Sequence, residues 1–315
     1  MGKLQGKEWI MTLEALPGWA DEINRRRDQI TVDGLNGLLG AHAVTMPLGE
    51  ALARQQIDPA VLDAWVKTQL VPKVASVESP STVESTETLL RRIAADPHGF
   101  WSEFYAQRFP EIKCTLPTMR GTKPKTRGWI DDGSLLPIYL PTAFTSAIFP
   151  EGWIKPDWGR HIDASQIAHH PLPGRWVVIE LVRKPNWDDQ RGYGDGKDRL
   201  ALELGLQTRF KISWDHLRAT LCPQVAKFWG LKAIRPLTAE EWNFFGNVLL
   251  ELNRLHGTSF QDLGATASWE WTESAYGSDS RVLVGDRDDG GLGAVRRGWS
   301  SDPGGVVGFR LLGVL

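Results

Sequence analysis

Apolar residues in the first part of the chain recur at three- and four-residue spacing, the pattern of one face of an α-helix. The pattern covers residues 20–30 ("ADEINRRRDQI") and 48–56 ("LGEALARQQ"). A further helix is expected to begin at Asp58, because Asp is a favoured N-cap and Pro59 suits the first helical position. Another is expected over residues 88–109. These patterns predict a helical N-terminal region over residues 1–112.

The periodicity is interrupted in two places. Residues 74–88 ("VASVESPSTVESTET") are rich in Ser, Thr, Glu and Pro, which is typical of a mobile connector. From Thr115 to His170, Pro, Gly and Trp recur without periodicity. The basic stretch 121–128 ("GTKPKTRG") lacks the glycine and lysine spacing of a phosphate-binding loop, so we expect a solvated loop there. We interpret this part as the loop-rich entry to a second domain over residues 113–315.

The second domain begins with a run of β-branched and apolar residues at 174–185, which predicts a strand. Two helices follow, at 213–231 with Ser213 as the cap and at 237–257. Thr238 and Glu241 have the spacing of a capping box, and Gly257 suits the helix end. Short strands are expected at 268–274, 280–285, 292–299 and 306–315. The order predicts an α+β domain whose last strand pairs beside its first.

Composition sets the broad class of protein. Of 315 residues, 42% are apolar and 23% are charged, as in a folded soluble protein. The net charge of -2 gives no electrostatic case for a nucleic-acid or anionic-membrane partner. No run of eighteen apolar residues would span a membrane, and the acids within 8–16 ("EWIMTLEAL") break any secretion signal. The two cysteines, Cys114 and Cys222, are expected to be free thiols, so we expect a cytoplasmic location.

A DNA-binding helix–turn–helix is an alternative interpretation of residues 47–70. Such a motif needs a basic recognition helix, and this stretch carries none. Two packed helices are the favoured interpretation, and no nucleic-acid partner is expected.

Three stretches of the second domain resemble one known family. Residues 235–245 ("RPLTAEEWNFF") resemble the helix start of C-type lectin domains of the formylglycine-generating-enzyme type, with Pro-Leu at 236–237 where that family has Leu-Pro. Residues 268–274 ("SWEWTES"), 285–295 ("GDRDDGGLGAV") and 308–315 ("GFRLLGVL") resemble the end of the same domain. The similarity is greatest to the variable proteins of diversity-generating retroelements and covers about residues 170–315.

The resemblance implies a C-type-lectin-like fold in which the last strands and loops form a mutable ligand-binding face. It also implies that Gly308-Phe309-Arg310 anchors the final strand. In that family, mutable positions cannot become Lys, Glu, Gln, Met or Trp. Residues 281–315 contain no Lys, Glu, Gln or Met, and the single Trp299 is then a scaffold position. A glycine-rich β tail would also be poor in Lys and Glu, so both explanations stay open.

The acids Asp286, Asp288 and Asp289 have three interpretations. They do not match the spacing of an EF-hand calcium loop, whose twelfth position would be Arg297 here. Acid–base catalysis needs a buried acid with a raised pKa, whereas an exposed turn flanked by glycines keeps its acids ionised. The third interpretation, ligand binding at an exposed surface, agrees best with the resemblance.

Enzymes on the same fold remain the alternative. Formylglycine-generating enzymes use a late pair of redox cysteines, and here only Cys222 lies in the resembling part. Iron-dependent sulfoxide synthases need a His and carboxylate facial site, and we find no such motif. His169-His170 could bind zinc, but two exposed imidazoles are the simpler interpretation. We expect no cofactor, no metal and no catalytic residue.

The sequence therefore predicts a non-enzymatic binding protein, with an oxidoreductase of the formylglycine-generating-enzyme or sulfoxide-synthase type as the alternative. Leu292, Val295, Trp299 and Phe309 are expected to point inward as anchors. The partner is expected to be another protein, because a mixture of Asp and Arg suits a polar contact. The N-terminal helices are expected to serve docking or homo-oligomerisation. The expected ligand-binding residues are Asp286, Arg287, Asp288, Asp289, Arg296, Arg297, Ser300, Ser301, Asp302, Pro303 and Gly304.

Overall fold

The computed structural model describes residues 84–109, 115–119, 121–142, 144, 153–154, 163–186, 192–285 and 294–315. These residues belong to one of the two units into which contacts divide the chain, Pro80–Leu315. They form an α+β fold with two four-stranded sheets. The loop residues Asp286, Arg287, Asp288 and Asp289 lie outside the described residues, as do the helices expected before residue 84.

The first sheet, here called sheet A, has the strand order β1-β2-β8-β3. Its strands are β1 (Leu135–Leu140), β2 (Arg175–Glu180), β8 (Leu311–Val314) and β3 (Ile234–Pro236), and every neighbouring pair is antiparallel. Val178 pairs with Gly313, and Arg235 pairs with Leu312. The prediction that the end of the chain pairs beside the strand at 174–185 is confirmed.

The second sheet, here called sheet B, has the order β6-β5-β4-β7. β4 (Trp269–Tyr276), β5 (Ser280–Gly285) and β6 (Ala294–Trp299) form an antiparallel meander, and β7 (Val307–Phe309) runs parallel to β4. Residues 306–315 were expected to form one strand. They form two, because the chain leaves sheet B after Phe309 and enters sheet A at Leu311, with Arg310 between them.

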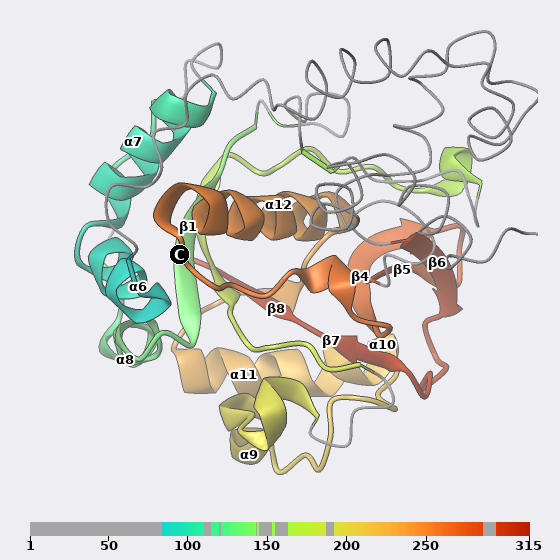
Figure 1. Ribbon diagram of the computed structural model, residues 1–315. Coiled ribbons are helices and arrows are strands. Elements are labelled where there is room, and N and C mark those ends of the chain that lie inside the picture. Colours follow the sequence, from blue (N-terminus) through green and yellow to red (C-terminus); the bar gives the residue numbers. More distant parts are fainter. Residues whose placement is uncertain are drawn as a thin grey trace, which may run out of the picture. The chain divides into compact units, whose positions relative to one another are not determined.

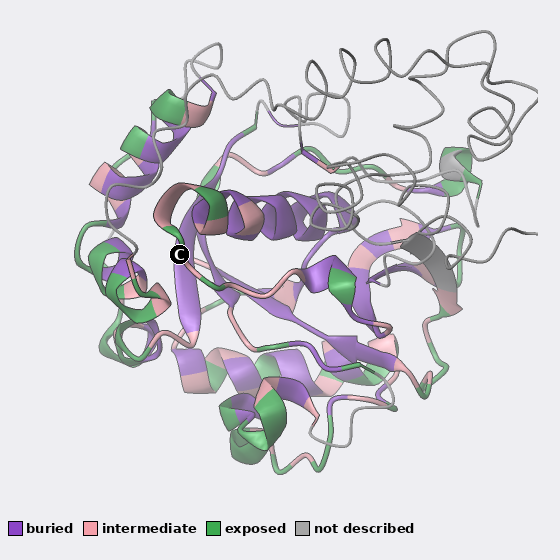
Figure 2. Cartoon of the chain, viewed as in Figure 1, coloured by how far each residue is buried: buried purple, intermediate pink, exposed green. Residues whose placement is uncertain are grey.

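The longest described helix, α12 (Ala239–His256), begins and ends as its sequence predicts. The Thr238 hydroxyl accepts from the Glu241 N–H at 3.2 Å, and the Glu241 carboxylate accepts from the Thr238 N–H at 2.8 Å. Gly257 ends the helix in the left-handed conformation, at φ 65°. Figure 2 shows that α12 is buried along most of its length.

Helices cover both sides of β7 and β8. α12 lies on one side and α11 (Cys222–Trp229) on the other, as Figure 1 shows. Alternating strand residues divide between two apolar clusters accordingly: Val177 and Leu312 join the cluster of α12, and Val178 and Leu311 join the cluster of α11. Both faces of sheet A are therefore packed at β2 and β8, which explains why these two strands read as nearly continuous apolar runs.

The helix predicted over 88–109 is two helices, α6 (Thr86–Ala95) and α7 (Pro97–Arg108). Pro97 disfavours a helical conformation at Asp96, and the Asp96 carboxylate instead caps α7 by accepting from the Gly99 N–H at 2.9 Å. α6 and α7 pack on β1, and Trp101 donates from Nε1 to the Pro137 carbonyl at 2.7 Å. From their periodicity, these residues were expected to belong to the N-terminal helical region.

The prediction of a solvated loop at 121–128 was wrong. α8 (Pro124–Asp131) begins there with Pro124 at its first position, and the buried Thr126 hydroxyl donates to the Trp229 carbonyl at 2.6 Å. β1 follows and was also missed, because Pro137 interrupts its pattern. A proline is tolerated in β1 because this strand lies at the edge of sheet A.

The helix expected at 213–231 is present in three consecutive parts: α10 (Trp214–His216), the π-helical η4 (Leu217–Leu221) and α11. Ser213 caps it, accepting from the His216 N–H at 3.2 Å. The Cys222 N–H bonds the Leu217 carbonyl, five residues back, directly before Pro223, which has no N–H to donate. The short elements η2 (Ala164–Gln166), η3 (Tyr193–Gly196), α9 (Arg199–Leu204) and η5 (Leu263–Ala265) complete the described part. None of its helices has the length and apolar character needed to cross a membrane.

Candidate functional site

A network of buried charges underlies the end of the chain. Arg209 is 1% exposed and donates to both oxygens of Glu180, at 2.5 and 2.7 Å. The same guanidinium binds the Asp198 carboxylate and donates to the Phe309 carbonyl at 3.2 Å. Arg209 therefore holds β2, the start of α9 and the last residue of β7 together. We call Glu180, Asp198, Arg209, Glu270 and Arg310 the charged core.

Arg310 makes the second half of the charged core. It contacts both oxygens of Glu270 at 3.3 Å and donates to the Glu180 carbonyl oxygen at 2.7 Å. Glu270 is fully buried and also accepts from Trp242 Nε1 at 2.6 Å and from the Tyr193 hydroxyl at 3.0 Å. Both oxygens of the Glu270 carboxylate therefore accept hydrogen bonds. These bonds offset the free energy lost when the charge is removed from water.

The charged core depresses the pKa of two carboxyl groups, those of Glu270 and Asp198. Burial alone would raise the pKa of Glu270, but the charges of Arg310 and Lys184 outweigh it and leave the pKa lowered. Burial likewise opposes ionisation of Asp198, and the hydrogen bond and charge of Arg209 leave its pKa lowered as well. Both carboxylates are thus ionised at neutral pH in the folded protein.

We expect the free energy of unfolding to fall as the pH is lowered from 5 to 3. Because the folded-state pKa values of Glu270 and Asp198 are depressed, their contribution is fully present above the unfolded-state pKa of about 4. It is lost as the pH falls through the folded-state values. Urea denaturation of the full chain at a series of pH values, followed by near-ultraviolet circular dichroism, measures this. A midpoint that stays constant down to pH 3 would contradict it.

The Gly308-Phe309-Arg310 motif is explained residue by residue. A Cβ at Gly308 would lie 2.4 Å from the Tyr193 hydroxyl oxygen, so a side chain does not fit there. Phe309 is completely buried beneath Arg209, whose guanidinium carbon lies 5.1 Å from the ring centre. Arg310 is 1% exposed in the charged core. The expectation that Phe309 points inward is confirmed.

The predicted ligand-binding residues after β6 lie in one exposed turn. Ser301, Asp302 and Pro303 are exposed, and Ser300 and Gly304 are half-buried. Backbone bonds hold this turn: the Ser300 N–H donates to the Asp279 carbonyl at 3.0 Å, and the Asp215 N–H donates to the Ser300 carbonyl at 3.0 Å. Further backbone bonds run from Asp302 to Trp299 and from Gly304 to Asp302, each at 3.0 Å. We call the turn and its neighbours the β6 surface: Trp214, Asp215, Arg281, Trp299, Ser300, Ser301, Asp302, Pro303 and Gly304.

One expectation about this region was wrong. Trp299 was expected to be an inward anchor but is 55% exposed at the end of β6. Arg296 pairs with Leu283 and Arg297 with Val282 on β5, and the side chains of both arginines lie outside the described part. Gly304 has a packing role, because a Cβ there would lie 2.8 Å from Cγ2 of Val307.

Trp214 and Arg281 belong to the β6 surface but were not among the residues predicted from the sequence. The Arg281 guanidinium carbon lies 3.9 Å from the centre of the Trp214 ring. Trp214 is on α10 and Arg281 is on β5, so no spacing along the chain indicates this contact. An arginine stacked on a tryptophan is a common component of binding surfaces.

The residues considered for catalysis are placed as follows. Cys222 is a buried free thiol whose pKa is raised to about 11 by burial, so it is protonated at neutral pH. His169 Nδ1 lies 3.1 Å from Glu240 Oε1. Within the described ranges, no three His, Cys, Asp or Glu side chains gather as a metal-binding group. Cys114 lies outside those ranges.

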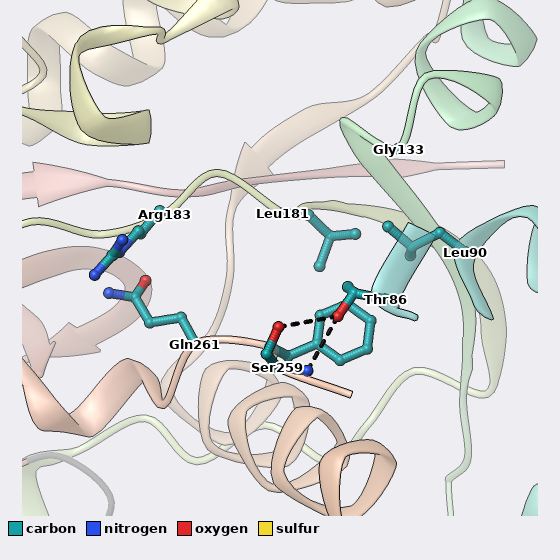
Figure 3. A pocket seen from close by; sticks show the side chains of 8 residues that line it. Thr86, Leu90, Gly133, Leu181, Arg183, Ser259 and Gln261 are labelled. Carbon is teal, nitrogen blue, oxygen red and sulfur yellow. Dashed lines mark hydrogen bonds between the residues drawn. The ribbon is translucent and has the colours of Figure 1, made fainter. Parts of the chain in front are cut away.

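A cavity of about 410 Å³ lies away from the β6 surface, between α6, the residues after β2 and the residues after α12. Figure 3 shows Leu90 and Leu181 on one side and Arg183 with Gln261 on the other. The polar side chains already have partners: Gln261 bonds both backbone groups of Lys184, Arg183 bonds Asp195, and Thr86 accepts from the Ser259 N–H. The cavity therefore offers apolar volume but little recognition chemistry.

The chain was compared with known families, curated proteins and solved structures. No family model matches the chain, and no curated protein or solved structure is significantly similar to it.

Proposed function

We propose that this chain is a non-enzymatic binding protein whose C-terminal domain has a C-type-lectin-like fold of the formylglycine-generating-enzyme type. Its ligand-binding surface covers residues 286–304, is diversified by a retroelement and binds another protein. The N-terminal region serves docking or homo-oligomerisation, and the protein acts in the cytoplasm.

The observation that carries the proposal is how the turn after β6 is held. Four of its bonds, at Trp299, Ser300, Asp302 and Gly304, join backbone atoms to backbone atoms and do not depend on the side chains present, while Ser300 Oγ adds one longer side-chain bond to Asp215 Oδ2 at 3.3 Å. Ser301, Asp302 and Pro303 can therefore change without loss of these bonds. A surface that must vary while its fold stays constant requires this arrangement.

The charged core supports the same proposal. It fixes Phe309 and Arg310 directly after the exposed turn, with contacts to β2, α9 and β4. The variable positions would then lie on a rigid support, which lowers the entropy lost when a ligand binds. The exposed Trp299 adds an aromatic side chain, the residue type that most often dominates protein–protein contacts.

Substitutions in the turn test whether its exposed side chains contribute to the stability of the fold. We expect Ser301→Ala and Asp302→Ala each to change the free energy of unfolding by less than about 0.5 kcal/mol. Gly304→Ala is the matched control in the same turn, and its clash with Val307 should cost about 1–3 kcal/mol. Urea denaturation of the three variants measures both effects. A large loss in Ser301→Ala or Asp302→Ala would mean that these side chains are structural.

Diversification is tested on the DNA beside the gene. A near-copy of the codons for 281–315, differing almost only at adenines and lying beside a reverse transcriptase gene, is the expected result. Absence of any such copy would remove retroelement diversification from the proposal.

A further inference from the structure

Arg281 lies in a small group of charged side chains at the border of the β6 surface. Besides Arg281 the group contains Arg218 from η4, Arg235 from β3, and the carboxylates of Glu241 and Glu273. Arg235 binds both oxygens of Glu241, at 2.6 and 2.7 Å, and Arg218 Nε lies 3.2 Å from Glu273 Oε2. Two arginines thus have carboxylate partners. In the part of the chain that the structure describes, no carboxylate lies within 4.0 Å of Arg281.

The N–H groups of the Arg281 guanidinium make few hydrogen bonds to the described residues. Its only bond to a described residue is a long one, from Nη1 to the carbonyl of its neighbour Ser280 at 3.4 Å. Arg281 Nε and Trp214 Nε1 are buried, and neither has a hydrogen-bond partner among the described residues. Arg281 as a whole is half-buried, so an acceptor from outside can meet the remaining N–H groups of the guanidinium, although not the enclosed Nε.

The position of Arg281 is preorganised. Stacking on Trp214 at 3.9 Å fixes the plane of the guanidinium, so little side-chain freedom is left to lose on binding. The residues opposite Arg281 on the two neighbouring strands are small, Ala275 on β4 and Gly298 on β6. A planar fork held in this way matches a carboxylate, which accepts two parallel bonds from it.

The surrounding charges limit what can approach. Asp215, Asp279 and Asp302 are exposed on or beside the β6 surface. A long acidic stretch would be repelled by them, whereas one carboxylate among neutral or basic residues gains the Arg281 contact and avoids most of the repulsion.

We propose that Arg281, held against Trp214, binds a single Asp or Glu carboxylate of the protein ligand. Arg281 is then a specificity-determining residue of the β6 surface. This inference rests on the proposed function for the source of the carboxylate, but the binding of a carboxylate to Arg281 is measurable by itself.

The first test titrates the full chain with sodium acetate, with sodium chloride keeping the ionic strength constant. The readout is the indole N–H resonance of Trp214, assigned with Trp214→Phe. We expect a saturable shift with a millimolar dissociation constant, weakened at least about tenfold in Arg281→Gln. Arg281→Lys keeps the charge but not the fork, so it should weaken binding by a similar factor if the fork is what matters.

Arg199→Gln is the matched control. Arg199 is also stacked on a tryptophan, 3.7 Å from the ring centre of Trp129, but it already binds Asp132. Acetate should leave the Trp129 resonance unchanged, and Arg199→Gln should leave the Trp214 titration unchanged. No saturable shift in the wild type, or an equal one in Arg281→Gln or Arg281→Lys, would overturn the inference. Tighter binding of inorganic phosphate than of acetate would overturn the carboxylate assignment.

The second test separates this inference from the proposed function. A displayed random peptide library is selected on the full chain, and the binders are tested on Trp299→Ala and Arg281→Gln. Binders that need both residues and share one Asp or Glu support the inference. Binders that need Trp299 but not Arg281 would leave the proposed function intact and overturn the inference. If no binder depends on the β6 surface, the proposed function fails, while the acetate titration still decides the role of Arg281.

Discussion

Replacing Arg209 by methionine is expected to lower the free energy of unfolding by about 3–5 kcal/mol. The substitution keeps much of the apolar volume but leaves Glu180 and Asp198 buried without their cation, and both carboxylates are bonded to Arg209 in the folded protein. A stable domain has about 5–15 kcal/mol in total, so this single loss would remove a large part of it. Urea denaturation at pH 7 measures the change.

The pH dependence of Arg209→Met gives an independent check. Without the arginine, its hydrogen bond and charge no longer offset the burial of Asp198, so the folded-state pKa of Asp198 rises and the folded state binds a proton more tightly. Stability of the variant should therefore increase as the pH falls from 7 towards 5. Arg91→Met is the control, because Arg91 and Glu87 form an ion pair with side chains 72% and 73% exposed. That variant should lose less than about 0.5 kcal/mol. Equal losses in the two variants would contradict the importance of the charged core.

Arg310→Met is the second substitution with a large expected effect, again about 3–5 kcal/mol. Glu270 would keep its bonds from Trp242 and Tyr193 but would lose the cation that contacts both of its oxygens. The Glu180 carbonyl oxygen would also lose its donor. Because Arg310 lies between β7 and β8, both sheets should be weakened together, and protection from amide hydrogen exchange should fall in β4 and in β2.

A double variant separates charge from packing. Glu270→Gln removes the negative charge and keeps a side chain of the same shape. Arg310→Met combined with Glu270→Gln should therefore be more stable than Arg310→Met alone, by more than about 1 kcal/mol. If the second substitution gives no recovery, the cost of Arg310→Met comes from lost packing and not from an unpaired charge.

The elements with local sequence features were predictable. The capping box at Thr238 and Glu241 and the terminal Gly257 determine the ends of α12 through contacts a few residues apart. β2 is predictable because its apolar run is bounded by glycine and proline. The pairing of β8 with β2 followed from the order of elements, which permits few topologies.

Elements defined by tertiary contacts were not predictable in this way. β1 contains Pro137 and reads as irregular, yet its position at the edge of sheet A and its packing on Trp101 make it a strand. α8 follows basic residues that suggest a loop, and it is fixed by the bond from Thr126 to the Trp229 carbonyl. The break between β7 and β8 at Arg310 could not be predicted either, because "GFRLLGVL" has one continuous apolar pattern.

The candidate site was also predictable only where local sequence decides the outcome. Exposure of Ser301, Asp302 and Pro303 agrees with their short polar side chains. The Arg281–Trp214 contact depends on the packing of α10 against β5, and the partners of Arg209 lie up to 100 residues away in the chain. Trp299 was expected inside as a scaffold position among the polar residues, but its place at the end of an edge strand exposes it.

The place of β8 affects how this domain can be synthesised and folded. β8 is inserted between β2 and β3, so neither of those strands has its inner neighbour until Leu311–Val314 arrives. During translation both strands wait with open edges, a state that favours pairing with other chains. Sheet A can therefore close only after residues 311–314 are available, so its completion is a late step in folding.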